Sequence, residues 1–107
     1  MIGTGFKHVG FLTRKPDQSV EQFQSHWHDV HSELARRIPG LRGYVLNPID
    51  RTRYPQAPVD GFSELWFDSE EAAAEAFETP EGKACFEDVE NFIGTLTIAN
   101  IHETRVA

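Results

Sequence analysis

The sequence predicts an α+β domain, with helices packed on one face of a four-stranded antiparallel sheet. Strand-like and helix-like patterns follow the order strand, helix, strand, strand, helix, strand along the chain. The second half repeats the arrangement of the first, and 107 residues are one domain's worth of chain. We therefore expect residues 1–107 to fold as a single domain of this kind.

The first half of the chain contains a strand, a helix and a second strand by these patterns. Residues 6–14 (FKHVGFLTR) alternate as a strand, in which one face carries Phe6, His8, Gly10 and Leu12. Next, SVEQ at 19–22 fits a capping box, and apolar residues then recur at helical spacing up to a Pro-Gly pair. We expect a helix over 20–37 and a strand over 41–47 (LRGYVLN).

The second half repeats this arrangement after a connecting loop. Residues 48–60 are rich in proline and charge, and a loop of this length is typical of a functional lid or rim. GFSELWF at 61–67 alternates as a strand, and residues 68–94 predict a helical region that is broken at its Thr-Pro pair. The β-branched stretch 95–106 predicts a closing strand. This order is the split βαβ, or ferredoxin-like, topology.

Large apolar side chains occupy both faces of the first predicted strand. Phe6 and Leu12 lie on one face, and Val9 and Phe11 lie on the other. Helices cover only one face of such a sheet, and an apolar sheet surface of this size is seldom left in water. We therefore expect a symmetric homodimer that packs sheet against sheet.

Charge and hydropathy exclude two classes of partner. The chain has 10 Lys and Arg residues against 17 Asp and Glu residues, and its net charge of −7 opposes binding to a phosphate backbone. The N-terminal MIGTGFKHVGF lacks the features of a signal peptide, and no run of about 20 apolar residues is present to cross a membrane. We expect a cytoplasmic protein that binds neither nucleic acid nor membranes.

Three of the five histidines lie within HWHDVH at residues 26–31. At about 100° per residue, the apolar stripe of the helix is centred near Trp27, and His31 lies about 55° from that centre. His26, about 85° away on the other side, and His28, about 115° away, are expected in solvent. A metal site on His28 and His31 would need further ligands, and no known ligand motif is present, so we expect no metal.

Four segments carry a family resemblance: FQSHWHDVHSEL, IPGLRGYVLN, VDGFSELWFDSEEA and TPEGKACFEDVENFIG. In this order and spacing they resemble the EthD family of small dimeric α/β-barrel proteins over nearly the whole chain. The matching positions are Trp27 and His31 on the first helix, Pro-Gly-Leu followed by Tyr44, and the stretch from Glu64 to Phe67. The resemblance implies a ferredoxin-like homodimer, in agreement with the patterns above.

Two looser resemblances point to enzymes of the same barrel class. NFIG and PGLRGY are similar to segments of 4-methylmuconolactone methylisomerase, a cofactor-free isomerase of similar length. FKHVGFL, which contains His8, is similar to the first strand of polyketide cyclases, where a histidine shares the pocket with other acid–base groups. These resemblances imply that His8 belongs to the site and that no cofactor is needed.

Residue chemistry and resemblance together predict a cofactor-independent enzyme that isomerises, cyclises or rearranges a small apolar carbonyl or lactone compound of catabolic or polyketide type. A histidine beside an apolar cavity transfers protons near neutral pH, so His31 is the expected base, with Tyr44 and His8 as polar anchors. The substrate is expected between the sheet and the first helix. Its expected contacts are Trp27, Phe62, Leu65 and Trp66.

Other functions and residue roles stay open at this point. A non-catalytic small-ligand-binding or accessory protein of a degradation pathway would have the same fold, because fold alone does not determine function. A haem-degrading or cofactor-free monooxygenase is a further possibility by analogy with the barrel class. Tyr44 and His8 could serve packing alone, Glu64 could line the cavity or pair across the dimer, and Cys85 is expected as a small core residue.

Overall fold

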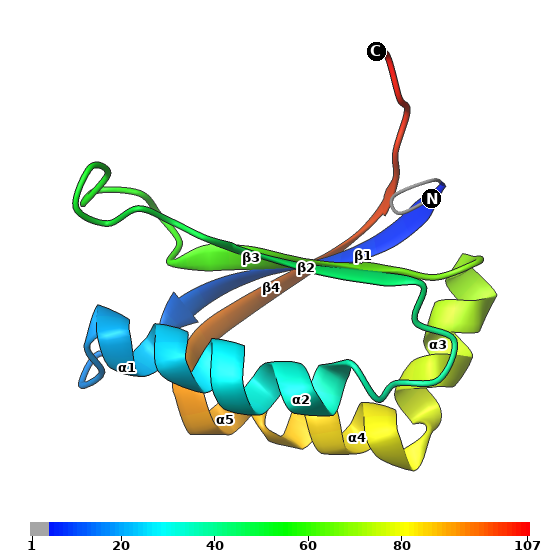
Figure 1. Cartoon of the computed structure of the whole chain (residues 1–107), viewed down its shortest axis with the longest axis horizontal. Helices are drawn as coiled ribbons and strands as arrows, with labels where there is room; N and C mark the ends of the chain where they lie inside the picture. The colour runs from blue at the N-terminus through cyan, green and yellow to red at the C-terminus, as the bar shows by residue number, and fades with distance from the viewer. Residues whose placement is uncertain (1–4) are drawn as a thin grey trace.

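The computed structural model describes residues 5–107 and has the expected α+β architecture (Figure 1). The strands are β1 (Phe6–Arg14), β2 (Gly43–Pro48), β3 (Gly61–Trp66) and β4 (Ile93–His102). The helical elements are α1 (Val20–Ser25), the π-helix η1 (His26–His31), α2 (Ser32–Ala35), α3 (Glu70–Glu78), α4 (Pro80–Glu87) and α5 (Val89–Phe92). Within the described residues, no helix has the length and apolar character needed to cross a membrane.

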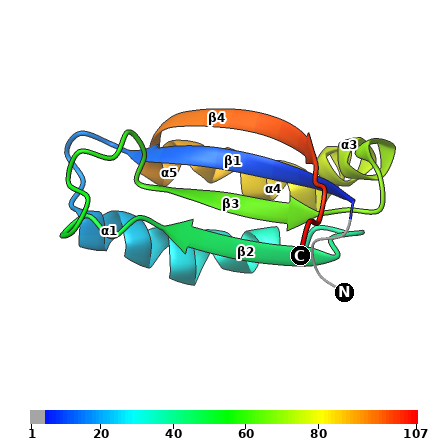
Figure 2. The same cartoon turned by 90° about the horizontal axis from the view of Figure 1, so that it is seen from above.

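The four strands form one antiparallel sheet in the order β2-β3-β1-β4, and the helices cover one face of it (Figure 2). This confirms the predicted ferredoxin-like topology. Directly opposite residues in an antiparallel pair point to the same face. Because His8 pairs with Leu65 and Leu65 pairs with Tyr44, these three side chains form a row across the helix-covered face.

The first helical region begins as predicted, since Ser19 and Gln22 form both hydrogen bonds of a capping box. Its middle differs from the continuous α-helix expected over 20–37, because η1 (His26–His31) is a π-helix. The Ser32 N–H donates to the carbonyl of Trp27, five residues earlier, which is the hydrogen bond of a π turn. Single π turns inside α-helices are rare and are frequently found at functional sites.

The remaining boundaries follow local chemistry. The predicted break in the second helical region is confirmed: Thr79 caps α4 by accepting from the Gly82 N–H at 3.1 Å, and Pro80 occupies the first helical turn. β2 and β4 begin and end a few residues away from the predicted 41–47 and 95–106. Strand ends carry no strong sequence signal, so shifts of this size are ordinary.

The connection between β2 and β3 is held down by a buried carboxylate. Asp60 Oδ1 accepts from Arg14 at 2.6 Å and from Arg51 at 2.9 Å, and Asp60 Oδ2 accepts from the Arg14 N–H at 2.7 Å. The loop rises on the side of the sheet away from the helices (Figure 1). It is therefore not a lid over the helix-covered face of its own chain.

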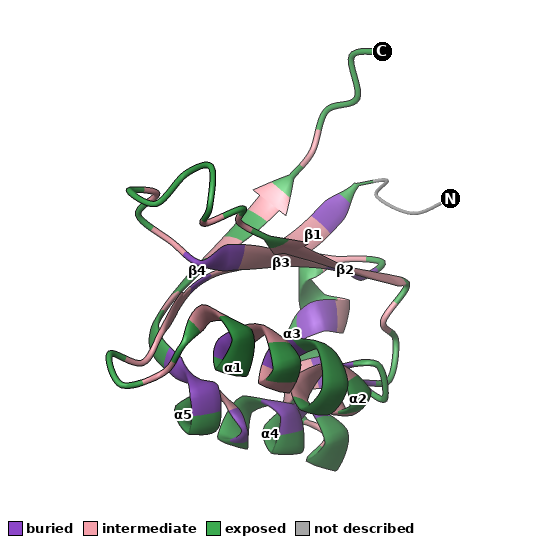
Figure 3. Cartoon of the chain, turned by 60° about the vertical axis from the view of Figure 1, so that its left-hand side comes forward, coloured by how far each residue is buried: buried purple, intermediate pink, exposed green. Residues whose placement is uncertain are grey.

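Two apolar clusters form the core, and buried residues occur both on the sheet and on the helices that cover it (Figure 3). One contains Phe6, Ala35, Ile38, Leu65, Phe67, Ala73, Ala76 and Cys85, and the other contains Leu12, Phe23, Trp27, Phe92 and Ile93. Trp27 is fully buried and lies directly on Gly61, where an added Cβ would come within 2.7 Å of its ring. The glycine therefore lets the indole approach the sheet.

The face of the sheet away from the helices is mixed in character. Val9 is only 2% exposed there, and the rings of Phe11 and Phe62 pack with centroids 6.0 Å apart. Glu64 accepts from Lys7 Nζ at 2.8 Å and from Asn47 Nδ2 at 3.0 Å. Glu64 thus pairs within its own chain and does not line the helix-side cavity.

Candidate active site

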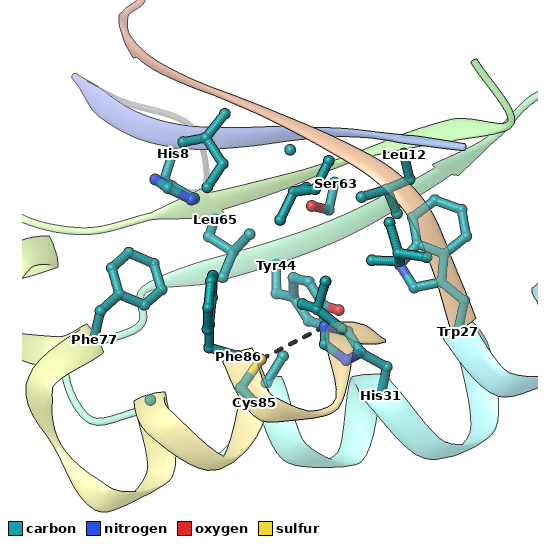
Figure 4. Close-up of a pocket in the computed structure, with 17 residues that line it drawn as sticks. His8, Leu12, Trp27, His31, Tyr44, Ser63, Leu65, Phe77, Cys85 and Phe86 are labelled. Atoms are coloured by element: carbon teal, nitrogen blue, oxygen red, sulfur yellow. Dashed lines mark hydrogen bonds between the residues drawn. The ribbon is translucent and has the colours of Figure 1, made fainter. Parts of the chain in front are cut away.

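A cavity lies between the sheet and the helices, and members of both core clusters line it (Figure 4). The space open to the centre of a water-sized sphere is about 80 Å³, and all space between its atoms, with the solvent at its mouth, is about 580 Å³. Its lining residues are His8, Gly10, Leu12, Trp27, His31, Ala35, Tyr44, Ser63, Leu65, Phe77, Gly82, Cys85, Phe86, Val89, Ile93, Leu96 and Ile98. All four strands, η1, α2, α3, α4 and α5 thus contribute to one concave and mainly apolar site.

His31 enters this cavity from η1 with a fixed orientation. Its Nδ1 lies 2.9 Å from Oδ2 of Asp88, a carboxylate that is 6% exposed between α4 and α5. An ionised carboxylate only accepts hydrogen bonds, so Nδ1 carries the hydrogen and Nε2 keeps its lone pair. The arrangement therefore presents a base, Nε2 of His31, to the cavity.

The same carboxylate also holds His26. The Nε2 atom of His26 lies 2.9 Å from Oδ2 of Asp88, and the His26 ring stacks on Phe92. The expectation that His26 is solvated is therefore wrong. Residues five apart lie about 140° apart on an α-helix, whereas the i→i+5 turn of η1 brings His26 and His31 towards the same side. His28 is exposed, as expected.

Asp88 is ionised and His31 is neutral in this arrangement. Burial alone would raise the pKa of Asp88, but hydrogen bonds from Asn91, His26 and His31 lower it below its usual value. Burial lowers the pKa of His31, and the neighbouring Asp88 offsets only part of that effect. At neutral pH, Nε2 of His31 is thus free of a proton and able to accept one.

Three further polar groups face the cavity from the sheet. Tyr44 on β2 has its pKa raised by burial, so its hydroxyl stays protonated and remains a hydrogen-bond donor. Ser63 on β3 lies next to Gly10, since its Oγ would be 3.2 Å from a Cβ added there. His8 on β1 bonds through Nδ1 to Oδ1 of Asn100 at 3.1 Å, and burial lowers its pKa.

Cys85 on α4 completes the group around His31. Its Sγ lies 3.5 Å from Nε2 of His31 (Figure 4), whereas Asp88 contacts the other ring nitrogen. Burial raises the pKa of Cys85 to about 11, so the sulfur is a thiol at neutral pH. Cys85 does pack in the core as expected, but it also lines the cavity.

The structure brings together five of the seven residues that the sequence placed in the site. His31, Tyr44, His8, Trp27 and Leu65 all line the cavity. The other two, Phe62 and Trp66, lie on the opposite face of the sheet. Phe62 pairs with Phe11 and Trp66 pairs with Lys7, so both alternate away from Leu65.

His28 and His31, the pair considered as metal ligands, make other contacts in the described structure. Among residues 5–107, no group of three or more His, Cys, Asp or Glu side chains is placed to hold a metal ion. His28, considered as a ligand beside His31, instead bonds through Nδ1 to the Gln24 carbonyl oxygen at 2.7 Å.

Comparison with known proteins identifies the family. The model of the EthD domain matches residues 15–95, about three quarters of the chain. The chain belongs to the EthD family. An 11.0 kDa protein encoded in the thcB-thcC intergenic region of Rhodococcus erythropolis is 29% identical over 70 residues, which are 65% of this chain and 68% of that protein.

A solved EthD family protein has the same fold. The crystal structure from Bacillus halodurans is 27% identical, has a TM-score of 0.82, and covers 94% of this chain and 100% of its own. The two folds therefore agree over nearly the whole of both chains. This agreement supports the arrangement of sheet and helices that builds the cavity.

Three more distant structures share the fold alone. A dimeric ferredoxin-like protein from Bacteroides fragilis is 14% identical with a TM-score of 0.71, covering 92% of this chain and 95% of its own. Hydroxynitrile lyase from Passiflora edulis is 14% identical with a TM-score of 0.72, and each chain is covered to 97%. SnoaB, a cofactor-independent oxygenase from Streptomyces nogalater, is 12% identical with a TM-score of 0.69, and each chain is covered to 97%.

Sequence reasoning missed three groups of the site in this EthD domain: Cys85 and Ser63, which line the cavity, and Asp88, which bonds to His31. Cys85 and Asp88 are three residues apart on one helical region, a spacing that places both on the same side. Ser63 precedes Leu65 by two residues, so strand alternation places both on one face. Both spacings can be read from the sequence. The sequence does not show, however, which other element packs against the helix face of Cys85 and Asp88 or the strand face of Ser63 and Leu65.

Buried neutral histidines make the stability of the EthD domain dependent on pH. Burial lowers the pKa of His8 and His31 below 6.5, so the unfolded chain binds more protons than the folded one just below that pH. The free energy of unfolding therefore decreases as pH falls below about 6.5 towards the folded pKa values. Urea denaturation between about pH 7.5 and 5.5 will show this decrease.

The matched variant carries glutamine at both positions. His8→Gln/His31→Gln removes the two groups that take up protons on unfolding, so its stability is expected to change less with pH. The relevant quantity is the slope of the free energy of unfolding against pH. The absolute free energy of unfolding is not used, because both substitutions also change it. A slope equal to that of the wild type would contradict this assignment.

Proposed function

We propose that this protein catalyses proton transfer on a small, uncharged, largely apolar carbonyl or lactone compound without a cofactor. The observation that carries the proposal is the orientation of His31, whose Nδ1 is held by Asp88 while Nε2 faces the cavity. A neutral base in a mainly apolar cavity suits the removal of a hydrogen next to a carbonyl group. The enolate that this step forms is a common intermediate in isomerisations and cyclisations of carbonyl compounds.

The lining of the cavity supports an uncharged ligand. None of the described residues that line it is Asp, Glu, Lys or Arg. A charged substrate group would lie there without a fixed partner of opposite charge, at a high cost in free energy. Apolar walls from Trp27, Leu65 and Phe77 suit a small hydrocarbon skeleton.

The polar groups have distinct roles in this reaction. Nε2 of His31 takes the proton from carbon, and Asp88 stabilises the imidazolium that forms. The Tyr44 hydroxyl, which burial keeps protonated by raising the pKa, donates to the developing enolate oxygen. His8, at the Phe77 end with ring centroids 4.7 Å apart, is a second polar anchor.

The distant structures support a small-molecule enzyme on this fold. One is named a hydroxynitrile lyase and another a cofactor-independent oxygenase. These two names describe different reactions, so they do not indicate which reaction this chain catalyses. The choice of proton transfer rests on His31 and Asp88.

Hydrogen exchange into simple carbonyl compounds tests the proposal directly. The protein is incubated in D₂O with cyclohexanone, cyclohexenone or γ-valerolactone, and NMR follows deuterium entering the position next to the carbonyl group. We expect uptake above the buffer rate with at least one compound. Resonance shifts of cavity residues without uptake on any compound would favour the alternative of a non-catalytic small-ligand binder.

We also propose that a second copy covers the sheet face away from the helices. The 49–60 loop and the C-terminal segment both project on that side (Figure 1), and the paired residues Phe11 and Phe62 on that face are half-buried. The Bacteroides fragilis structure is described as dimeric. Sheet-to-sheet packing would bury these rings and leave the cavity on the outside of each protomer.

Phe62→Asp tests the dimer. An unpaired carboxylate in the centre of a sheet-to-sheet interface loses its water without gaining a partner, so the variant is expected to be monomeric. Light scattering after gel filtration measures the mass. Phe86→Asp is the matched control, because Phe86 is 64% exposed at the cavity mouth. A dimer that persists in Phe62→Asp at micromolar concentration would contradict this interface.

A further inference from the structure

Cys85 contacts the proposed base His31, which in turn contacts the carboxylate of Asp88. It is the single cysteine of the chain, and its Sγ lies 3.5 Å from Nε2 of His31, whose Nδ1 lies 2.9 Å from Asp88 Oδ2. Because Nε2 carries the lone pair, the thiol donates its hydrogen to it. A nucleophile, a base and an orienting group in this order form the arrangement that activates nucleophiles for covalent catalysis.

The surroundings of the sulfur favour one kind of electrophile. The thiol lines a cavity without charged lining residues in the described chain, so an electrophile there is uncharged. Tyr44 lines the same cavity as Cys85 (Figure 4), and burial raises the pKa of its hydroxyl. A carbonyl oxygen near the Tyr44 hydroxyl would receive a hydrogen bond while a carbon of the same molecule lies near the sulfur.

We propose that Cys85 forms a reversible covalent adduct with an uncharged α,β-unsaturated ketone or lactone bound in the cavity. This inference rests on the proposed function, because His31 is the base in both. It narrows the ligand from carbonyl compounds in general to conjugated ones. It also assigns a role to the Cys85 thiol, which has none in the proton-transfer reaction proposed above.

The step conserves atoms and electrons. The thiol proton passes to Nε2 of His31 while sulfur forms a bond to the β carbon. The electron pair of the carbon–carbon double bond moves between the α and carbonyl carbons, and the pair of the carbonyl double bond moves to its oxygen. The Tyr44 hydroxyl donates to this enolate. His31 then returns the proton to the α carbon and leaves a thioether, and the reverse sequence releases the ligand. No oxidant or second reactant is required.

The state of the thiol makes this reaction depend on His31. Burial raises the pKa of Cys85 to about 11, so little thiolate forms at neutral pH without a base beside it. An ordinary accessible cysteine would react through its own thiolate. For Cys85, removal of His31 should therefore slow the addition much more than it would slow the reaction of an exposed cysteine.

Intact-protein mass spectrometry with cyclohexenone tests the inference. The wild type is expected to gain one adduct, mapped to Cys85, and to do so faster than N-acetylcysteine at the same pH. His31→Gln should react about 100-fold more slowly, the usual size of a general-base contribution. His28→Gln, a matched change on the exposed side of η1, should react like the wild type. Cys85→Ser should form no adduct, and Cys85→Ala is a second thiol-free variant.

Two results would overturn the inference. One is the absence of an adduct in the wild type under conditions in which N-acetylcysteine reacts. The other is an equal rate in the wild type and in a folded His31→Gln variant.

Cyclohexanone separates this inference from the proposed function, because it has exchangeable α-hydrogens but no double bond to accept sulfur. Deuterium uptake into cyclohexanone by the wild type, without an adduct from cyclohexenone, overturns the covalent step and leaves proton transfer standing. An adduct at Cys85 that depends on His31, without deuterium uptake into any saturated ketone or lactone, supports the covalent step and counts against proton transfer.

Discussion

His31→Gln is expected to lower deuterium uptake into the carbonyl ligand by about 100-fold or more, because it removes the base while keeping a polar side chain. The amide of glutamine does not accept a proton at neutral pH, although it can still reach Asp88. Ligand affinity should change far less, since most of the cavity wall is apolar. NMR exchange rates at saturating ligand give the first quantity, and chemical-shift titration gives the second.

The matched control is His28→Gln. His28 lies on the same π-helix but is exposed and bonds to the Gln24 carbonyl oxygen. The control should leave the rate of deuterium uptake unchanged. If His31→Gln exchanges as fast as His28→Gln while folded, His31 has no part in the reaction.

Asp88→Asn is expected to lower the same rate by about 10- to 100-fold with little change in ligand affinity. Asp88 does not line the cavity; it orients His31 and stabilises the imidazolium, so it is a positioning residue. An amide lacks the negative charge and can donate to Nδ1, which would place the hydrogen on Nε2 instead. The pH dependence of the remaining activity should move to lower pH, because the pKa of His31 loses the support of the carboxylate.

Asp29→Asn makes the same chemical change at an exposed position of η1, where Asp29 accepts from Ser25 at 3.3 Å. It should leave both rate and pH profile unchanged. In Asp88→Asn/His31→Gln, the two losses should not add, because Asp88 acts through His31. Additive losses, or an unchanged pH profile in Asp88→Asn, would show that Asp88 has only a structural role.

The fold could be predicted from the sequence because its signals are local. The alternation around His8, the capping box at Ser19 and the break at Pro80 each depend on a few neighbouring residues. The row formed by His8, Leu65 and Tyr44 depends on strand register, which the alternation of each strand constrains. The π turn lacks such a signal, and an ideal α-helix therefore misplaced His26.

The site could be predicted only in part, because its chemistry depends on contacts between distant segments. His31 was found from helical rotation and family resemblance, but Asp88 and Cys85 lie more than 50 positions further along the chain. Phe62 and Trp66 were expected against the substrate because they are large and apolar. The structure places them on the opposite face, since aromatic character does not indicate which face of a strand is covered.

The central claim is that Asp88 holds His31 as a neutral base with Nε2 open to the cavity, and nitrogen NMR of the histidine ring tests it most directly. Long-range proton–nitrogen correlation spectra of ¹⁵N-labelled protein, recorded across the pH range, report which ring nitrogen carries hydrogen and where the ring titrates. The account predicts hydrogen on Nδ1 at neutral pH and a pKa below 6.5 for His31. Hydrogen on Nε2, or a ring that is already protonated at neutral pH, would contradict it.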